Sequence, residues 1–557
     1  MSKQGPNVQK SKTSELETWA RANATIIERD QWNTWLTSQY ASQDAVEVLD
    51  WPGIGGLYAR LEPVCVRGLG TFGNVAAEDD AVLSYFVTTP AVQKIRDGEV
   101  LLVLGRKGSG KTALVRHFTE GTEGIRSRAL TLGSYPWQVH ESRGDSSVSE
   151  VEAYVASWRY LIAVQFAALL IQHPDTDHAT SEASAIKEFL DRNYGGAAPD
   201  LEDILRPSSL VLSKASFEPQ VLGNKLGSIS LERANANAGR ELNALTDALL
   251  ASVQTLGAAC GIEKISLHFD ELDRGLVELS PSRKNMLIGL VLAAREVSRW
   301  TSDKAMKCWP VIYLRTDIWE DLKFSDKNKI TQSKALNLRW DNFSLLDLVN
   351  ERIRASLGTS ATWATIASPS LTRGSQAKID HVIARTFLRP RDVISFLNAA
   401  LAAAKGRDVI ASVPLIIENP DVTKAREEYS SYLKKELEDE IAPHWPAWED
   451  ALRTCSRIST ITFPVEQFRE EYARRKSTGN DLSADDALAI LYNFSVIGYE
   501  QRSGYGGVTW VFQYINPDAG WDSGATRFKV HAGLKEVAKL REERSAGSAS
   551  DEVTDEA

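Results

Sequence analysis

Apolar residues gather into short runs that alternate with longer segments of helical spacing through the first two thirds of the chain. Three short, largely apolar runs are typical of buried strands: residues 100–104, 265–269 and 310–314. Segments with helical spacing lie around them: residues 76–95, 149–172, 181–193, 240–256 and 281–300. Because strands that alternate with helices form parallel sheets covered by helices, this part of the chain predicts an α/β fold.

The last third of the chain has helical patterns first and strand patterns afterwards. The helical patterns cover residues 344–353, 390–403, 421–441, 445–455, 464–475 and 483–494, and the strand patterns cover residues 496–502 and 508–514. Pro390 suits the first turn of its helix, because that position needs no backbone N–H. The final three helices and the hairpin predict a winged-helix domain.

The strand at residues 100–104 leads into a glycine-rich turn and then into a helix. Residues 105–112 read GRKGSGKT and fit the pattern G-x-x-x-x-G-K-[ST] of a phosphate-binding loop. Such a turn directs consecutive backbone N–H groups into one concavity, where they hold phosphate oxygens. Lys111 would reach the β- and γ-phosphates, and the Thr112 hydroxyl would bind Mg²⁺. The expected ATP-binding residues are Gly105, Arg106, Lys107, Gly108, Ser109, Gly110, Lys111, Thr112 and Ala113.

An acidic pair, Asp270 and Glu271, stands at the end of the strand at residues 265–269. This is the Walker B pattern, in which Asp270 would hold the Mg²⁺ shell. Glu271 is placed as the general base that polarises the attacking water. Asp273 and Arg274 follow. Arg274 could pair with Asp273 at the surface or reach a neighbouring subunit as an arginine finger.

Arg315 follows the strand at residues 310–314 and is a candidate sensor of the nucleotide. A guanidinium at this position could donate hydrogen bonds to the γ-phosphate. The alternative is an ion pair with Asp317 or Asp321. Together with Lys111 and Glu271, Arg315 is expected to carry the hydrolytic chemistry.

Arg389 and Arg391 flank Pro390 at the start of the helix over residues 390–403. A helical lid could present either of them to the nucleotide, because the planar fork of arginine binds phosphate oxygens bidentately. The alternative is a salt bridge with Asp392 at the helix entry.

Composition is that of an ordinary globular protein. Of the 557 residues, 43% are hydrophobic and 25% are charged. The apolar stretches at residues 161–171 and 286–294 are too short to span a bilayer, and the polar residues 1–13 lack the apolar core of a signal peptide. The four cysteines are far apart and predict free thiols: Cys65, Cys260, Cys308 and Cys455. We expect a cytoplasmic protein without membrane contact.

The net charge of −10 is spread over a nearly neutral body and an acidic tail. Residues 541–557 hold two basic and six acidic residues, and residues 456–540 hold ten of each. Phosphate contacts normally supply most of the affinity for nucleic acid. The third helix of the expected winged helix contains Asp485 and Asp486 and no Lys or Arg. Charge therefore favours a protein partner over DNA.

Together, five motifs resemble those of prokaryotic P-loop ATPases of the AAA+ and STAND type. The motifs are GRKGSGKTAL at 105–114, HFDELDRG at 268–275, YLRTDIW at 313–319, RPRDVISFLN at 389–398 and, more weakly, FKVHAGLK at 528–535. The resemblance implies a P-loop NTPase sheet sandwich, a helical lid and a C-terminal winged-helix domain. It also implies a bacterial subgroup often linked to anti-phage defence. Arg315 at the sensor strand favours the STAND side and leaves assembly as a ring hexamer in doubt.

These observations divide the chain into six expected segments. They are an N-terminal helical extension at 1–72, a P-loop ATPase core at 73–343 with a long insertion at 113–264, a helical lid at 344–420, a connector helix at 421–442, a winged-helix domain at 443–540 and a disordered acidic tail at 541–557.

The sequence favours an Mg²⁺-dependent ATPase that acts as a switch or motor in a larger, homo-oligomeric assembly with a protein partner. One alternative is a DNA-associated ATPase of the replication-initiator or helicase-loader kind. A second alternative is a small-molecule P-loop kinase, which would need an acceptor pocket and no water-activating Glu271.

Overall fold

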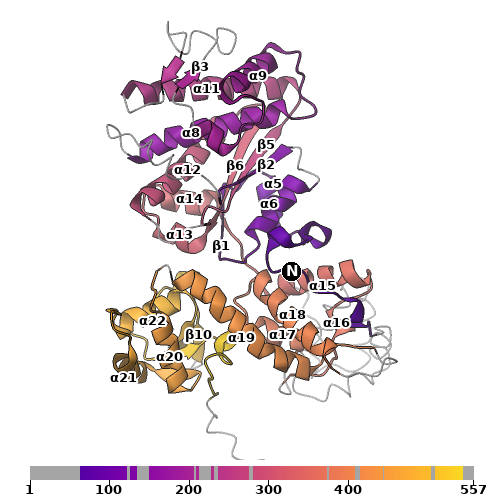
Figure 1. Ribbon diagram of the computed structural model, residues 1–557, viewed down its shortest axis with the longest axis vertical. Coiled ribbons are helices and arrows are strands. Elements are labelled where there is room, and N and C mark those ends of the chain that lie inside the picture. Colours follow the sequence, from indigo (N-terminus) through magenta and orange to yellow (C-terminus); the bar gives the residue numbers. More distant parts are fainter. Residues whose placement is uncertain are drawn as a thin grey trace, which may run out of the picture. The chain divides into compact units, whose positions relative to one another are not determined.

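The computed structural model of the chain describes residues 63–121, 126–133, 150–205, 209–211, 228–230, 236–274, 280–372, 376–407, 414–442, 444–502 and 508–542. The chain forms two compact units (Figure 1). One comprises residues 81–339, and the other comprises residues 340–557 together with the segment up to residue 80. Most of the expected N-terminal extension and of the acidic tail lies outside the described residues.

A five-stranded parallel sheet is the centre of the unit at residues 81–339. Its order is β2-β5-β6-β1-β7, and its strands are β1 Leu102–Gly105, β2 Ser127–Thr131, β5 Lys264–Asp270, β6 Lys307–Arg315 and β7 Ala335–Asn337. The three strands expected from apolar runs are therefore confirmed within a few residues. The α/β fold class is also confirmed.

Helices cover this sheet on both faces (Figure 1). The helices are α5 Pro90–Arg96 and α6 Lys111–Glu120 on one face, and α8 Glu150–Ile171 and α12 Pro281–Trp300 on the other, with α13 Thr316–Asp321 and α14 Lys327–Lys334 near β6 and β7. Leu102 and Leu104 pack with α8 and α12, whereas Val103 packs with α5 and α6. This alternation is the strand period of two, and it explains why β1 reads as a continuous apolar run.

The long insertion adds a helical layer outside α8. It contains α9 Ser181–Tyr194, α10 Leu201–Leu205, the antiparallel strands β3 Ser209–Val211 and β4 Ser228–Ser230, and α11 Ala236–Ala259. Among the described residues, a single helix, α8, is both long enough and apolar enough to cross a membrane. However, 83% of its most apolar 18-residue window is buried inside the protein. A helix that is apolar all round is also usual in the core of a large domain.

The expected helix at residues 76–95 is wrong over most of its length. This segment contains the short 3₁₀ turns η2 Ala77–Asp79 and η3 Val82–Tyr85, and α5 begins only at Pro90. Thr89, the residue before this proline, is extended. Proline clashes with a helical conformation at the residue before it, so the helix cannot extend backwards through Thr89.

The second unit begins with a helical domain. Its helices are α15 Asn342–Leu357, α16 Trp363–Ile366, α17 Lys378–Ile383, α18 Pro390–Lys405 and α19 Asn419–Ile441. Pro390 occupies the first turn of α18 as expected. The stacked rings of Phe396 and Tyr429 join α18 to α19 in its core.

The segment at residues 64–80, which contains the short 3₁₀ turns η1 Val66–Gly68 and η2 Ala77–Asp79, is hydrogen-bonded to this helical domain. The Asn398 side chain on α18 accepts from the Phe72 N–H at 2.8 Å and donates to the Gly73 carbonyl at 3.0 Å. Arg352 on α15 donates to the Phe72 carbonyl and to Asp80 at 2.7 and 2.9 Å. Residues 73–80, which the sequence assigns to the ATPase core, therefore pack within the other unit.

The C-terminal part combines three helices with a four-stranded antiparallel sheet of order β10-β9-β11-β8. These elements are α20 Glu449–Ile458, α21 Val465–Arg475, α22 Ala484–Asn493, β8 Thr462–Pro464, β9 Ile497–Arg502, β10 Val508–Val511 and β11 Arg527–Val530. The three helices and the hairpin β9–β10 match the expected elements. Strands β8 and β11 were not expected, because each has only three or four residues.

Candidate functional site

The candidate site lies at the carboxyl edge of the parallel sheet. Strand β1 ends at Gly105, β5 ends at Asp270 and β6 ends at Arg315. In parallel strands these ends face the same edge, which is where α/β sheets bind ligands. Strand β6 lies between β1 and β5, so the three motifs of the first unit meet along one edge.

The phosphate-binding loop adopts a backbone that only its glycines take without strain. Gly108 and Gly110 have φ of 78° and 99°, in the left-handed region that side chains disfavour. Gly110 caps α6, whose first turn contains Lys111, Thr112 and Ala113. The first-turn N–H groups of a helix have no partner within the helix and can hold an anion.

Gly105 is needed for close packing within the loop. A Cβ atom at this position would lie 2.3 Å from the Ser109 Oγ atom, so the Ser109 hydroxyl would have to move for any other residue to fit. Ser109 is itself buried. Arg106 and Lys107 lie between these two residues and are half-buried.

The Lys111 amine folds back over its own loop. It donates to the carbonyl oxygens of Gly105 and Arg106 at 3.0 and 3.2 Å. Burial lowers the pKa of Lys111, against the opposing influence of the nearby Asp273 and Asp270 carboxylates. The acidic residues of the second motif therefore lie close enough to act on the charge of this lysine.

Asp270 is buried and lies close to the phosphate-binding loop. The Thr112 hydroxyl, the Glu271 backbone N–H and the Lys111 amine lie near its carboxylate. Burial raises the pKa of Asp270, and these three neighbouring groups oppose the rise. Thr112 and Asp270 come from different motifs, so their proximity brings the two expected Mg²⁺ ligands together.

Glu271 begins a tight turn directly after β5. It has a φ of 57°, which is uncommon for a residue with a side chain. Its Oε2 atom accepts from Arg274 Nη1 at 2.9 Å. The expected surface pair of Arg274 with Asp273 is therefore replaced by a pair with Glu271.

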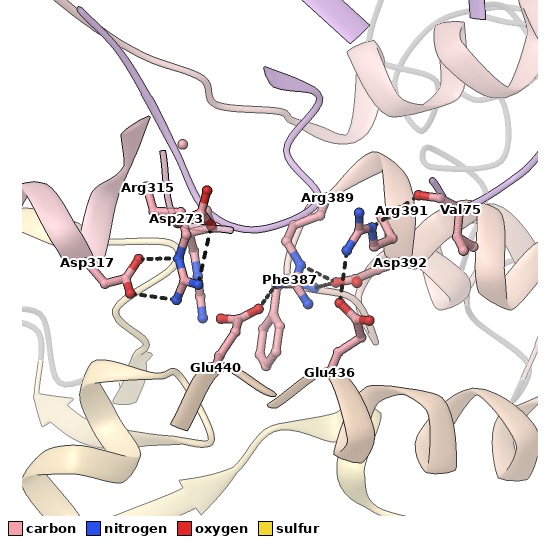
Figure 2. A network of polar contacts seen from close by, with 12 residues as sticks. Val75, Asp273, Arg315, Asp317, Phe387, Arg389, Arg391, Asp392, Glu436 and Glu440 are labelled. Atoms are coloured by element: carbon pink, nitrogen blue, oxygen red, sulfur yellow. Dashed lines mark hydrogen bonds and ion pairs between the residues drawn. The ribbon is translucent and has the colours of Figure 1, made fainter. Parts of the chain in front are cut away.

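Arg315 is held between two carboxylates (Figure 2). It donates to both oxygens of Asp317 at 3.0 and 2.7 Å and lies 3.5 Å from Asp273. The ion pair with Asp317 is one of the two alternatives for Arg315. Asp321 forms its ion pair with Lys284.

A buried polar network lies behind the acidic pair, on the face of β5 that points toward α6. His268 Nδ1 is 2.9 Å from the Tyr313 hydroxyl, and its Nε2 is 3.2 Å from Ser266 Oγ. Burial lowers the pKa of His268 to about 3, so this imidazole is neutral. Phe118 of α6 stacks on its ring. The network ties the helix after the phosphate-binding loop to β5 and β6.

Sequence reasoning did not single out His268, Tyr313 or Gly133. The signal for His268 was present: Ser266, His268 and Asp270 alternate with apolar residues along β5. Strand periodicity places these polar residues on one face. Gly133 follows β2, a strand that the sequence did not predict, so its place beside Glu271 could not be anticipated.

Arg389, the N-cap of α18, and Arg391, in the first turn of that helix, lie in the second unit and are held by carboxylates there (Figure 2). Arg389 is 2% exposed and donates to Asp392 at 2.9 Å and to Glu440 at 2.6 Å. Arg391 is more exposed and donates to the Val75 carbonyl at 3.1 Å and to Glu436 at 3.2 Å. The salt bridge with Asp392, the alternative for this motif, is present at Arg389.

Comparisons with known proteins give one family model for the helical domain and weak structural likenesses over most of the chain. Residues 344–438 match the family model of the FunZ-associated C-terminal helical domain, from α15 into α19. No curated protein matched the chain in a sequence search.

Three solved structures are similar to most of the chain at low identity. The Orc1 protein of Aeropyrum pernix in complex with DNA has 10% identity and a TM-score of 0.36 over 84% of this chain and 96% of that chain. A Walker-type ATPase of Pyrococcus abyssi has 13% identity and a TM-score of 0.34 over 80% and 97%. Cdc6p from Pyrobaculum aerophilum has 14% identity and a TM-score of 0.28 over 82% and 96%. At such TM-scores, the fold assignment rests on the sheet topology.

Proposed function

We propose that the chain is an Mg²⁺-dependent ATPase that acts as a switch or motor within a multiprotein assembly. The observation that carries this proposal is that Thr112 and Lys111, which follow the glycine-rich loop, lie close to the Asp270 carboxylate. This proximity connects a loop whose backbone suits a phosphate ligand to the acidic end of a buried strand. A glycine-rich loop alone would suit many phosphate ligands, and the acidic strand end narrows the choice to a metal-bound nucleotide.

The oxygen donors fit Mg²⁺, which is hard and prefers one or two protein oxygens completed by water and substrate phosphates. Thr112 supplies a hydroxyl and Asp270 a carboxylate. Within the described residues, no group of three or more His, Cys, Asp or Glu side chains is placed to hold a metal. A site of this sparse kind needs the nucleotide to complete it. Bound Mg²⁺ would neutralise charge on the phosphates.

In the proposed reaction, the oxygen of a water molecule bonds to the γ-phosphorus and the bond to the β-phosphate oxygen breaks. Glu271 accepts the proton that the water loses. Lys111 holds the β- and γ-phosphates, and Arg315 stabilises the charge on the γ-phosphate. ADP and phosphate leave.

The helical domain and the C-terminal domain, which we assign as a winged helix, would transmit the nucleotide state to a partner. Arg391 is the better candidate for a lid arginine, because it is more exposed than Arg389 and its hydrogen bonds are longer. A contact between Arg391 and the bound nucleotide would favour one position of the helical domain over another. Nucleotide contacts reposition or order switch segments in this way in other nucleotide hydrolases.

We propose a protein as the partner of the C-terminal domain. Asp485, at the start of α22, accepts from Arg469 of α21 at 2.9 and 3.1 Å. The neighbouring basic side chain is therefore neutralised, which weakens any phosphate-binding surface on this helix. The motif resemblance extends the proposal to anti-phage defence.

The test measures phosphate release from ATP by the full chain and by the variants Glu271→Gln and Lys111→Ala, with and without Mg²⁺. We expect Mg²⁺-dependent turnover by the wild type, tight ATP binding without turnover by Glu271→Gln, and weak binding by Lys111→Ala. Equal turnover by all three proteins would show that the site is wrongly assigned. A phosphorylated acceptor in place of free phosphate would identify a kinase, and salt-sensitive DNA binding would favour the initiator alternative.

A further inference from the structure

The antiparallel sheet of the C-terminal part has two edge strands, β8 and β10, and its two edges are built differently. Next to β8, the Ile461 N–H donates to the Arg541 carbonyl at 2.9 Å, and the Arg541 N–H donates to the Ser459 carbonyl at 2.8 Å. Strand β8 also ends in Pro464, which has no N–H to offer. The chain itself therefore closes this edge.

Strand β10 lacks these protections in the part of the chain that the structure describes. It pairs there with β9 alone, so one side of its backbone has no partner strand. Its sequence, VTWV, contains no proline and no charged residue, and all of its residue types have high β propensity. Proteins usually protect an edge strand with such residues, because its N–H and C=O groups can pair with another chain. Strand β10 is thus built to accept a further strand.

Charged and apolar side chains lie beside this edge, on one face of the sheet. Arg502 of β9 is exposed and pairs across the strands with Val508, so the two side chains share a face. Glu500 and Trp510 form the next cross-strand pair on that face, because side chains alternate along a strand. Val508 is 53% exposed, which leaves an apolar side chain at the edge open to a partner.

Strand β11 adds two more basic residues to this face. Arg527 Nη1 donates to Glu500 Oε2 at 3.2 Å. The Lys529 amine lies 5.6 Å from the centre of the Trp510 ring. With Arg502, three basic residues stand against the one carboxylate of Glu500 on this face of β9, β10 and β11. Charge complementarity therefore favours an acidic occupant.

The same face suits a peptide better than a nucleic acid. Burial lowers the pKa of Lys529, and the Glu542 carboxylate opposes this effect, so a carboxylate of the chain already acts on the face. Glu500 neutralises Arg527, which weakens the attraction for phosphates that nucleic-acid binding needs. A peptide strand also supplies N–H and C=O groups at the spacing that continues a sheet, whereas a nucleic acid does not.

We infer that the free edge of β10 takes up an extended, acidic segment of a partner protein as a fifth strand of this sheet. The inference rests on the proposed role of the C-terminal domain in binding a protein, and it names the chemistry of the bound segment. Backbone hydrogen bonds to β10 hold the segment in place. One of its apolar side chains packs on Val508, and its carboxylates face Arg502 and Lys529.

The test measures the binding of short fluorescein-labelled peptides to the nucleotide-free full chain by fluorescence anisotropy. One peptide alternates glutamate with valine, and the other alternates lysine with valine. We expect the acidic peptide to bind about fivefold or more tightly than the basic one, because its charges oppose those of the face. No binding of the acidic peptide, or equal binding of both peptides, would overturn the inference.

Backbone methylation separates strand addition from docking through side chains alone. Two isomers of the acidic peptide are compared, one N-methylated at every glutamate and the other at every valine. The N–H groups of these two sets point to opposite edges of an extended strand, and only one edge pairs with β10. We expect one isomer to bind and the other to fail. Equal affinities of the two isomers would rule out strand addition.

A pair of variants that differ in charge locates the bound peptide. Val508→Glu and Val508→Lys remove the same exposed side chain and add opposite charges. Val508→Glu should bind the acidic peptide about fivefold or more weakly than Val508→Lys. The control is Leu83→Glu, which adds the same charge at an exposed apolar residue of the other unit and should match the wild type. Equal binding by the two Val508 variants would place the peptide elsewhere and overturn the inference.

This inference and the proposed ATPase function can fail separately. Peptide binding is measured without nucleotide, and phosphate release is measured without peptide. A chain that binds the acidic peptide and never hydrolyses ATP would keep the docking edge and lose the proposed ATPase. A chain that hydrolyses ATP and does not bind the peptide would lose the docking edge alone. A labelled oligothymidine that binds more tightly than the acidic peptide and is displaced by it would assign the face to nucleic acid and overturn the inference.

Discussion

The Lys111 amine lies 3.0 Å from the carbonyl oxygen of Gly105, the residue at which strand β1 ends. The lysine thus bridges the two ends of the loop in which it stands. Burial lowers the pKa of Lys111, and phosphate oxygens nearby would favour its charged form. Nucleotide binding is therefore expected to exchange two carbonyl partners for more strongly accepting phosphate oxygens.

Replacement of Lys111 by Met should weaken ATP binding by about tenfold or more, because charge-assisted contacts to the β- and γ-phosphates are lost. The affinity is measured by isothermal titration with a slowly hydrolysed ATP analogue. The affinity for ADP, which lacks the γ-phosphate, should fall by a smaller factor than the affinity for the ATP analogue. The control is Lys187→Met on the exposed face of α9. An analogue affinity equal to that of the wild type would remove Lys111 from the site.

Replacement of Arg315 by Ala should lower kcat by about tenfold to a hundredfold and leave ATP affinity nearly unchanged, since a sensor acts mainly on charge developing at the γ-phosphate. Asp317→Asn should have a smaller effect, because it loosens a bidentate partner while Asp273 remains at 3.5 Å. Single-turnover rates and equilibrium binding are both needed for this comparison.

The matched control for Arg315 is Asp321→Asn, which breaks the ion pair with Lys284 in the same unit. It should leave kcat unchanged. If Arg315→Ala lowered binding and left kcat intact, Arg315 would be a binding residue in place of a sensor.

The sequence predicted the sheet strands with long apolar runs and missed the short ones. Strand β6 has nine residues and β5 has seven, enough for a pattern to appear. Strand β7 has three, and its strand identity depends on pairing with β1. Gly105, Asp270 and Arg315 share one edge because β1, β5 and β6 are parallel, and the alternation of strands with helices predicts a parallel sheet. The strand order was not predicted. Pairing between strands is a tertiary property that short sequence windows do not contain.

Ion pairs between residues close in the sequence could be predicted, whereas ion pairs between distant residues could not. Arg315 pairs with Asp317, two residues away, and this pair was one of the predicted alternatives. The link from Arg389 to Glu440 spans 51 residues and depends on how α18 packs against α19. Arg274 had two acidic neighbours within three residues. In the structure, Arg274 pairs with Glu271 and not with Asp273, in a turn where Glu271 has a left-handed backbone. No residue pattern in the sequence predicted that backbone conformation.

Arg389 and Arg391 should respond differently to substitution. Glu440→Gln removes a partner from a guanidinium that is 2% exposed, and breaking a buried ion pair costs about 3–5 kcal/mol of unfolding free energy. Arg391→Ala should cost under about 1 kcal/mol, because its pair with Glu436 is longer and more exposed. Urea unfolding of the full chain, followed by fluorescence, gives both values.

ATP turnover separates the two arginines further. If Arg391 is the lid arginine, Arg391→Ala should lower turnover without loss of fold. Glu440→Gln should lower the unfolding midpoint while the molecules that remain folded hydrolyse ATP normally. The reverse result, in which only Glu440→Gln changes turnover per folded molecule, would assign the lid role to Arg389.

Asp450 should make the C-terminal domain sensitive to strong acid. Its carboxylate is 2% exposed and accepts from the Ser477 N–H and hydroxyl, from Asn480 and from Arg453, at 2.6–2.9 Å. Burial alone would raise the pKa of Asp450, but these hydrogen bonds outweigh it and lower the pKa to about 2. A carboxyl group with a lower pKa in the folded state stabilises the fold at pH values above its unfolded pKa.

The variant Asp450→Asn should therefore lose about 2 kcal/mol of unfolding free energy at pH 7. The asparagine cannot accept all four hydrogen bonds and does not ionise. As the pH falls from about 4 to about 2, the wild type binds a proton on unfolding and loses this advantage, so the difference between the two proteins should shrink. Urea unfolding of the full chain, repeated at each pH, measures the difference, with the exposed Asp481→Asn as control. A difference that stays constant down to pH 2 would show that the hydrogen bonds do not depend on the charge of Asp450.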